Sequence, residues 1–395
     1  MKILIIGLYY SNNLGDAILC DCTEALLRKN FPDAETEICD FLDRRSFAAA
    51  KEVTLEDQRF EQRHYRMRSM ASRFTPWDKE YLNECRQLRK NIDYINARCQ
   101  EDYDLVVFAG GQIFVDYLGL YVQAFTERFA KKNTPVLFNA CGTGPGSSPG
   151  VRKALSLALN DPHVKWISCR DGTEYVNKKL LTGGKRAFDT FDSAVWCSDV
   201  YGVGRRSREC SDPGVGGQSG QHLGLGLMYA NSLAEVKQTA FWIRIIRKLE
   251  RRHVSWKFFT NGSGKDQGYA RYVLGKIPEL TRPFEEYALP IPENQEDLVR
   301  MISSFDSILS MRLHSHIIAE SLGIPSVAVV WDQKLRSFFQ KAGHPERCCT
   351  VNMSPETVMA RLDCAQKEGI DEALTDHQKQ EAERLLVQAV DHVLS

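Results

Sequence analysis

The chain has 395 residues, of which 43% are hydrophobic and 26% charged, a composition typical of a globular protein with sizeable cores. Its length exceeds the usual size of one domain and predicts two. Lysine plus arginine and aspartate plus glutamate number 51 each, so the overall charge does not favour a nucleic-acid partner, which normally needs a basic face. No apolar run resembles a signal peptide or approaches the roughly 20 residues of a membrane helix. We therefore expect a cytoplasmic protein.

Strands alternate with helices along the first half of the chain. An apolar strand over 2–6 leads through Gly7 to Asn13-Leu14-Gly15-Asp16, which opens a helix. Further strands are expected at 35–41, 104–109, 135–140 and 165–169, and further helices at 118–130, 151–159 and 173–181. This alternation predicts a parallel sheet covered by helices. The first turn lacks the spacing of a dinucleotide-binding fingerprint.

The stretch 44–99 has no strand signals and is rich in arginine with interleaved aromatic residues. We interpret it as a helical insertion in the first domain. The insertion could be a solvated pair of helices whose apolar stripes pack on that domain. It could instead be a basic wall for an anionic or lipid-linked acceptor, with peripheral contact to a membrane surface.

The composition changes between 202 and 221, where several arginines lead into a glycine-rich stretch typical of a linker. We therefore predict an N-terminal Rossmann-like domain over 1–204, a linker over 205–221 and a C-terminal Rossmann-like domain over 222–395. In the second domain, strands are expected at 222–228, 255–260, 306–309 and 325–330, and helices at 233–252, 267–275, 294–305, 314–322, 356–365 and 375–394. The last helix could cross back to the first domain.

The twelve cysteines are scattered, with no CxxC pair and no cysteine–histidine cluster at the spacing of zinc ligands. Several lie within apolar strands or helices, so we expect reduced thiols in the core. We predict neither a metal site nor a cofactor.

Four strand-to-helix turns are expected to face one cleft between the two sheets, because ligands bind at the carboxyl edge of parallel strands. These turns are 13–16, 110–112, 142–146 together with 170–171, and 312–314. Glycine lets the backbone approach a ligand and leaves N–H groups free for an anion. The candidate substrate contacts are therefore Asn13, Gly15, Gly110, Gly111, Gly142 and Gly144. Each glycine could instead serve only its tight turn.

Two arginines at strand ends, Arg170 and Arg312, give a stronger signal than the glycines. A planar guanidinium binds a phosphate or a carboxylate through two parallel N–H groups. Arg170 could instead form a buried structural pair with Asp171 or Asp192. The pair of arginines predicts an anionic ligand.

His314 stands at the start of the helix that follows Arg312, where it could donate or accept a proton near neutral pH. His316 is two residues further along the helix and is expected to be structural. Asp16 is either a carboxylate that the helix dipole favours or a functional group, and Asp192 has the same two interpretations.

Taken in order, these motifs resemble the polysaccharide pyruvyl transferase family. The resemblance extends from residue 3 to about residue 340. It is carried by Ile3-Leu4-Ile5-Ile6-Gly7 with Asn13-Leu14-Gly15-Asp16, Gly110-Gly111, the turn 142–145, Ser168-Cys169-Arg170-Asp171, Asp192 and Met311-Arg312-Leu313-His314. The most specific part is Arg312-Leu313-His314 followed by Ala319-Glu320-Ser321-Leu322-Gly323-Ile324-Pro325.

The resemblance implies a two-lobed fold like that of the GT-B glycosyltransferases, with phosphoenolpyruvate as donor and a sugar, free or in a lipid-linked glycan, as acceptor. The product would be a pyruvate ketal that bridges two hydroxyls. By position, Arg170, Arg312 and His314 correspond to the donor-binding and catalytic residues of the family.

The donor carries a phosphate and a carboxylate, which two guanidiniums and helix N-termini can neutralise without a metal. We hypothesise that His314 shuttles the proton and that Asp16 or Asp171 orients or deprotonates an acceptor hydroxyl. Two other functions stay open for this architecture. One is a GT-B glycosyltransferase that uses a nucleotide sugar, and the other is a non-catalytic sugar-binding module.

Overall fold

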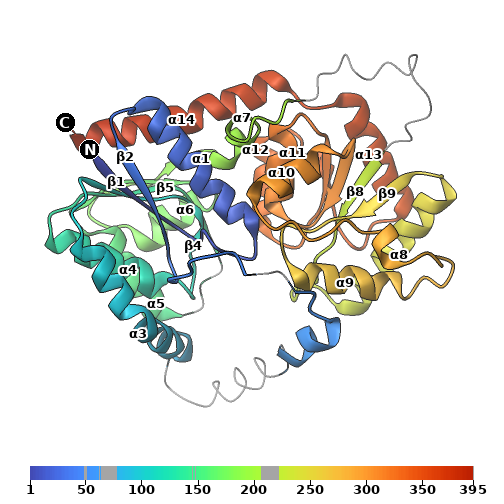
Figure 1. Ribbon diagram of the computed structural model, residues 1–395, viewed down its shortest axis with the longest axis horizontal. Coiled ribbons are helices and arrows are strands. Elements are labelled where there is room, and N and C mark those ends of the chain that lie inside the picture. Colours follow the sequence, from blue (N-terminus) through green and yellow to red (C-terminus); the bar gives the residue numbers. More distant parts are fainter. Residues whose placement is uncertain are drawn as a thin grey trace.

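The computed structural model describes residues 1–48, 51–61, 63, 78–144, 146, 148–205 and 222–394. Two parallel sheets lie side by side, each with helices on both faces (Figure 1). This arrangement confirms the predicted α/β class with two Rossmann-like domains. None of the helices in the described part of the chain is long and apolar enough to span a membrane. The eleven cysteines of these ranges are free.

The first sheet has the strand order β2-β1-β3-β5-β6-β7, and β4 also pairs with β5. Its strands are β1 (Lys2–Gly7), β2 (Glu35–Asp40), β3 (Leu105–Phe108), β4 (Gly111–Phe114), β5 (Val136–Thr143), β6 (Val164–Cys169) and β7 (Phe188–Asp189). The helical elements that follow them are α1 (Leu14–Asn30), α3 (Lys79–Gln100), α4 (Gly119–Lys131), α5 (Pro149–Leu159), α6 (Thr173–Tyr175), η1 (Val176–Leu180), η2 (Ser193–Trp196) and α7 (Cys197–Val200).

The second sheet has the strand order β12-β11-β10-β8-β9. Its strands are β8 (His222–Gly226), β9 (Ser255–Phe258), β10 (Ser307–Ser310), β11 (Ser326–Val329) and β12 (Cys348–Cys349). Its helical elements are α8 (Glu235–Arg251), α9 (Gly264–Leu274), η4 (Phe284–Glu286), α10 (Gln295–Ser303), α11 (Leu313–Ser321), α12 (Gln333–Lys341), η5 (Pro345–Arg347), α13 (Pro355–Glu368) and α14 (Glu372–Leu394).

Alternate residues of β1 face two different cores, because successive side chains of a strand point to opposite faces of the sheet. Leu4 and Ile6 pack with α3, α4 and α5 on one face. Ile3 and Ile5 pack with α1 and α14 on the other. The C-terminal helix α14 therefore crosses back and covers the first sheet (Figure 1).

A bulge in β5 changes the path expected after β3. Ala140 has a φ of 50°, and the pairing of β5 with β6 shifts its register between Phe138 and Cys141. Gly110, with a φ of 89°, passes so close to this bulge that a Cβ would lie 3.0 Å from the carbonyl oxygens of residues 139 and 140. The chain then pairs with β5 again as β4, so residues 111–114 form a short strand where a turn into a helix was expected.

The two domains share one continuous apolar core. Leu14 and Ile18 of α1, together with Val195 of η2, pack against Ile302 of α10 and Ile317 of α11. The backbone N–H of Leu14 also donates to the carbonyl oxygen of Asn261 in the second domain, at 2.9 Å. The carboxyl edges of the two sheets are therefore held facing each other.

The insertion expected in the first domain is divided between the two domains. Helix α3 packs on the first domain through Ile95. Residues 51–61, which we call the docked segment, lie on the second domain instead, with Leu55 2% exposed in the core beneath α8 and α9. Figure 1 shows this part of the chain beneath α9. Residues 49–50, 62 and 64–77 of the basic stretch 44–99, and residues 206–221 of the linker, lie outside the described residues.

His316 is fully buried and fixes the start of α11, as its structural interpretation predicts. Its Nε2 lies 3.1 Å from the carbonyl oxygen of Ser310, to which it donates, and its ring packs on Phe339 with 5.0 Å between centroids. Burial lowers the pKa of His316 to about 3. The imidazole is therefore neutral in the folded protein.

We expect His316 to make the protein less stable as the pH falls from about 6.5 towards 3. Below an ordinary histidine pKa of about 6.5 the unfolded chain binds a proton at His316 that the folded protein excludes. His316→Gln retains an N–H for Ser310 but does not titrate. Urea unfolding at several pH values measures the free energy of unfolding of both proteins. As the pH is lowered, the value for the variant should rise relative to that of wild type by at most about 1.4 kcal/mol per pH unit. A constant difference would contradict this assignment.

Candidate active site

The turn after β10 is fixed by a chain of hydroxyl contacts. Ser310 Oγ accepts from the backbone N–H of Arg312 at 3.1 Å and donates to Ser315 Oγ at 3.2 Å. Ser315 Oγ in turn donates to Asn261 Oδ1 at 2.8 Å. These side chains are buried, so their hydrogen bonds set the direction in which Arg312 and His314 leave the turn.

Arg312 is held by a carboxylate of its own domain. Its Nε and Nη2 donate to the two oxygens of Asp266 in the first turn of α9, at 2.8 and 2.7 Å. Burial works against the charge of Arg312, but Asp266 raises the pKa of the guanidinium above its ordinary value. Arg312 therefore stays charged with its orientation fixed.

Arg170 follows β6, and its side chain is only 6% exposed. Its Nη1 donates to Asp192 Oδ2, and its Nε lies 3.4 Å from Asp171 Oδ2. Both carboxylates that were alternatives for a structural pair are thus present. The backbone of the neighbouring strand β5 approaches so closely that a Cβ on Gly142 would lie 3.0 Å from Arg170 Nε.

Arg170 also reaches across the domain boundary to His314. Its Nη1 lies 3.1 Å from His314 Nε2. A guanidinium can only donate, so Nε2 must accept and the hydrogen of the neutral ring is on Nδ1. Burial, followed by the charge of Arg170, lowers the pKa of His314 to about 3. The ring is therefore neutral in the absence of a ligand, whereas the sequence suggested a histidine that titrates near pH 7.

The other side of the His314 ring faces α1. A Cβ on Gly15 would lie 2.2 Å from His314 Cγ, so the glycine makes room for the imidazole. His314 Nδ1 lies 3.4 Å from the side-chain nitrogen of Asn13, and that nitrogen donates to Asp16 Oδ2 at 3.2 Å. Asn13 Oδ1 is buried and has no partner among the described residues.

Asn13 therefore lies between His314 and Asp16 and contacts both. Rotating the Asn13 amide by half a turn would let Oδ1 accept the Nδ1 hydrogen of His314. That rotation would also replace the N–H that Asn13 donates to Asp16 with an oxygen. Asn13 can thus satisfy only one of its two neighbours with its amide nitrogen or oxygen at this position.

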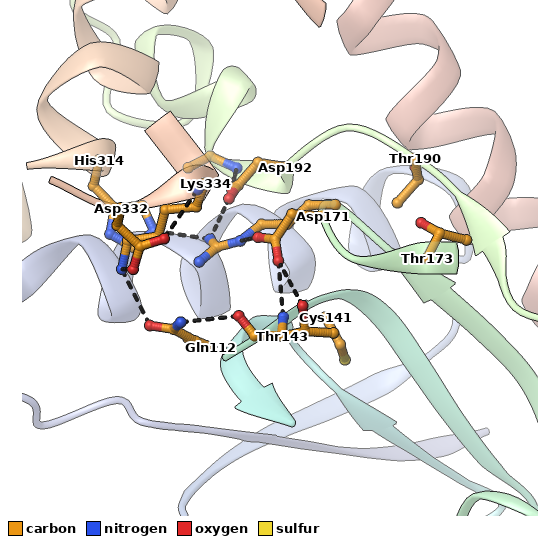
Figure 2. Close-up of polar contacts among 12 residues, drawn as sticks. Gln112, Cys141, Thr143, Asp171, Thr173, Thr190, Asp192, His314, Asp332 and Lys334 are labelled. Carbon is orange, nitrogen blue, oxygen red and sulfur yellow. Dashed lines mark hydrogen bonds and ion pairs between the residues drawn. The ribbon is translucent and has the colours of Figure 1, made fainter. Parts of the chain in front are cut away.

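Lys334, in the first turn of α12, is a cation that the sequence interpretation did not single out. Its Nζ donates to Gln112 Oε1 at 3.1 Å, and Gln112 Nε2 donates to the carbonyl oxygen of Thr143 at 2.9 Å. The backbone N–H of Thr143 donates to Asp171 Oδ1 at 2.8 Å, which completes a path between the domains (Figure 2). Burial lowers the pKa of Lys334.

A cavity of about 390 Å³ lies between the domains at this point. Its lining includes five residues proposed from the sequence, namely Asn13, Asp16, Arg170, Arg312 and His314. It also includes Gln112, from a turn that was expected to face the cleft, and four residues that were not among the candidates, namely Arg44, Tyr117, Trp331 and Lys334. Its volume is that of a small-molecule site.

The remaining predicted residues surround the cavity. Asp171 and Asp192 lie behind Arg170, as their bonds to it require. Gly111 faces Asp16, because a Cβ there would lie 3.8 Å from Asp16 Oδ1. Gly15, Gly110, Gly142 and Gly144 each lie against protein atoms, and contact of these glycines with substrate stays a prediction.

Residues that the sequence interpretation missed also come after strands, where ligands bind at the carboxyl edge of a parallel sheet. Trp331 and Lys334 come directly after β11, where a strand passes into a helix at the carboxyl edge of the second sheet. Tyr117 comes three residues after β4. Asp266 gave a weaker signal, because an acidic residue in the first turn of a helix is common.

Similar folds occur among solved structures. The UDP-GlcNAc 2-epimerase from Methanocaldococcus jannaschii is 13% identical, with a TM-score of 0.60 over 99% of this chain and 100% of the other. The UDP-GlcNAc 2-epimerase from Neisseria meningitidis, bound to UDP-GlcNAc, is 13% identical with a TM-score of 0.58 over 99% of each chain. These likenesses show a GT-B-like fold.

No curated protein matches the chain by sequence. A family model described as polysaccharide pyruvyl transferase matches residues 13–333, a range that contains the cleft residues from Asn13 to His314 and ends one residue before Lys334. The match spans well over half of the chain. The chain belongs to the polysaccharide pyruvyl transferase family.

Proposed function

We propose that the protein transfers pyruvate from phosphoenolpyruvate to two hydroxyls of a sugar, in a glycan or a glycan precursor, and releases phosphate. The observation that carries this proposal is the convergence of Arg170, Arg312 and His314 on one cavity between the domains. Arg170 and His314 come from different sheets and are 3.1 Å apart. An anionic donor held by both arginines therefore lies against the imidazole.

The arginines bind the donor through N–H groups that their carboxylates leave open. Within the described part of the chain, Arg170 Nη2 and Arg312 Nη1 make no hydrogen bond. Lys334 adds a cation whose nearest carboxylate, that of Asp332, is 3.9 Å away. The guanidiniums of Arg44 and Arg312 each have a carboxylate oxygen at 2.7 Å. Lys334 is thus the least neutralised cation of the four in the cavity, and it suits the phosphate.

Ketal formation needs one acid and one base in addition to these cations. Protonated His314 gives a proton to the methylene carbon of the donor, and one acceptor hydroxyl forms a bond to the central carbon. The bond from that carbon to the phosphate oxygen then breaks, and the second hydroxyl attacks the resulting cation. The two hydroxyl protons end on the new methyl group and on phosphate, so charge and atoms balance.

His314 takes up a proton when the donor binds, and a hydroxyl proton restores it after each transfer to the methylene carbon. The neutral ring of the unliganded protein has a pKa held down to about 3 by burial and by Arg170. A bound phosphate and carboxylate would offset the charge of Arg170 and raise that pKa. Asp16, linked to the ring through Asn13, is placed to accept a hydroxyl proton. Asp171 accepts hydrogen bonds from Thr143 and Arg170, so it is suited to orienting Arg170 for the donor substrate.

The acceptor meets the donor at the aromatic side of the cavity. Tyr117 is 61% exposed although it is large, so packing does not account for its position. Trp331 comes from the other domain, and its indole N–H donates to the carbonyl oxygen of Met311 at 2.7 Å, which fixes the ring. Flat aromatic faces suit the C–H face of a sugar ring.

The cellular setting is also part of the proposal. We place the reaction in the cytoplasm, with a free or lipid-linked glycan as the acceptor. In this proposal the protein uses neither a nucleic acid nor a cofactor. Peripheral contact of the basic 44–99 stretch with a membrane would bring the site to a lipid-linked acceptor. Comparing activity on free and vesicle-bound glycans tests this setting.

We expect phosphate release from phosphoenolpyruvate that depends on a glycan acceptor. The assay supplies the wild-type protein with phosphoenolpyruvate or UDP-GlcNAc, together with free and lipid-linked glycans, and follows phosphate and UDP. Release of UDP without phosphate would favour a nucleotide-sugar glycosyltransferase. Glycan binding without either product would favour a sugar-binding module.

His314→Gln should lower kcat by about 10²–10⁴-fold, because the proton donor is lost while the volume of the side chain is nearly kept. His316→Gln is the matched control, since it makes the same change at a second buried histidine of α11. Its kcat should stay close to that of wild type. Near-wild-type turnover by His314→Gln would refute the role of His314.

Tyr117→Ala should raise the KM for the acceptor about tenfold and leave the KM for phosphoenolpyruvate unchanged, as expected for loss of one aromatic contact. Tyr117→Phe keeps the ring and should behave like wild type. Initial-rate measurements with each substrate varied in turn distinguish the two effects. An equal rise in both KM values would place Tyr117 outside an acceptor site.

A further inference from the structure

The docked segment, residues 51–61, lies with its backbone directly on α9. Val53 N donates to the carbonyl oxygen of Gly264 at 3.0 Å. A Cβ on Gly264 would lie 1.7 Å from the carbonyl oxygen of Lys51, and a Cβ on Gly268 would lie 1.9 Å from that of Val53. Both distances are far inside van der Waals contact, so this packing requires glycine at both positions.

Side chains secure the docked segment around this backbone contact. Gln58 Nε2 donates to the carbonyl oxygens of Val53, at 3.0 Å, and of Lys265, at 2.8 Å, so it joins the segment to α9. Arg59 pairs with Glu235 of α8 through Nε at 3.0 Å. These contacts lie on the second domain, although the segment follows a strand of the first.

The same turn of α9 holds the donor-binding arginine. Asp266 lies between the two glycines in the sequence, is 2% exposed, and binds Arg312 through both of its oxygens. Gly268, inside the helix, weakens α9 by about 1 kcal/mol relative to alanine. Ser263 Oγ caps the first turn by accepting from the Asp266 N–H at 3.4 Å, and the backbone of the docked segment packs on the same turn.

We propose that the docked segment positions Arg312 for the donor by fixing the first turn of α9, and with it Asp266. Asp266 and the segment are positioning elements, because neither lines the cavity. The inference rests on the proposed function, since it takes phosphoenolpyruvate as the ligand of Arg312. It assigns a role to an insertion that otherwise only ties the first domain to the second.

Gly268→Ala tests the proposal with a single methyl group. Alanine is the better helix former, so any harm to α9 must come from displacing the docked segment. Gly275→Ala is the matched control on the C-terminal side of the same helix, where a Cβ would lie 3.5 Å from its nearest neighbour, which is ordinary contact. Both variants are made in the full chain.

Gly268→Ala should raise the Kd and the KM for phosphoenolpyruvate about tenfold and leave the KM for the acceptor unchanged. Hydrogen–deuterium exchange without ligand should become faster in the peptides that contain 263–270 and 310–316. Gly275→Ala should match wild type in both measurements. Wild-type values for Gly268→Ala, or equal losses in the two variants, would overturn the proposal.

A purely structural role would have a different signature. Both KM values would rise with a fall in kcat and in the melting temperature, and that result would also overturn the proposal. If wild-type protein neither binds nor consumes phosphoenolpyruvate, the proposed function fails. The exchange of the two peptides then still decides whether the docked segment fixes the turn of Arg312.

Discussion

The contact between Arg170 and His314 organises the centre of the molecule, because it joins the carboxyl edges of two separate sheets. A buried guanidinium is always charged and always a donor, so it fixes both the neutral state and the tautomer of the imidazole. The charge must also be balanced, and Asp192 and Asp171 do this from the first domain. The shared core around Leu14 and Ile317 keeps the two edges at this separation.

Charge balance also explains why a carboxylate lies behind each of the two arginines that face the cavity. Arg170 and Arg312 would repel each other and move in an empty cavity if Asp192 and Asp266 did not hold them. The carboxylates would cost some affinity for the anionic donor that we propose, but they keep the guanidiniums oriented. Fixed dipoles and charges of this kind stabilise a reaction without reorganisation. Lys334, with its neutral partner Gln112, would offset part of that lost affinity.

The sequence was sufficient for the parts of the site that lie at strand ends. Asn13 and Arg170 follow strands of the first sheet and His314 follows a strand of the second. The rule that ligands bind at the carboxyl edges of parallel strands therefore finds all three. It could not find Asp266, because the partner of Arg312 is chosen by helix packing between residues far apart in the chain. Nor could it place residues 51–61, since their one buried apolar side chain, that of Leu55, would fit a core of either domain. No glycine or proline at residue 140 signals the bulge there. Beside this bulge, residues 111–114 form strand β4 where the sequence predicted a turn.

The links between the domains favour a cleft that is largely formed before substrates bind. Hinge opening would expose Leu14, Ile18 and Ile317, each at 3% exposure or less, at a cost of roughly 1.5–3 kcal/mol per side chain. It would also break the bonds from Lys341 Nζ to the carbonyl oxygens of Arg170 and Thr190, both 2.8 Å. The docked segment ties the domains at a third place. In the proposed reaction the substrates would therefore enter an assembled site, where the arginine orientations set by Asp266 and Asp192 are already in place.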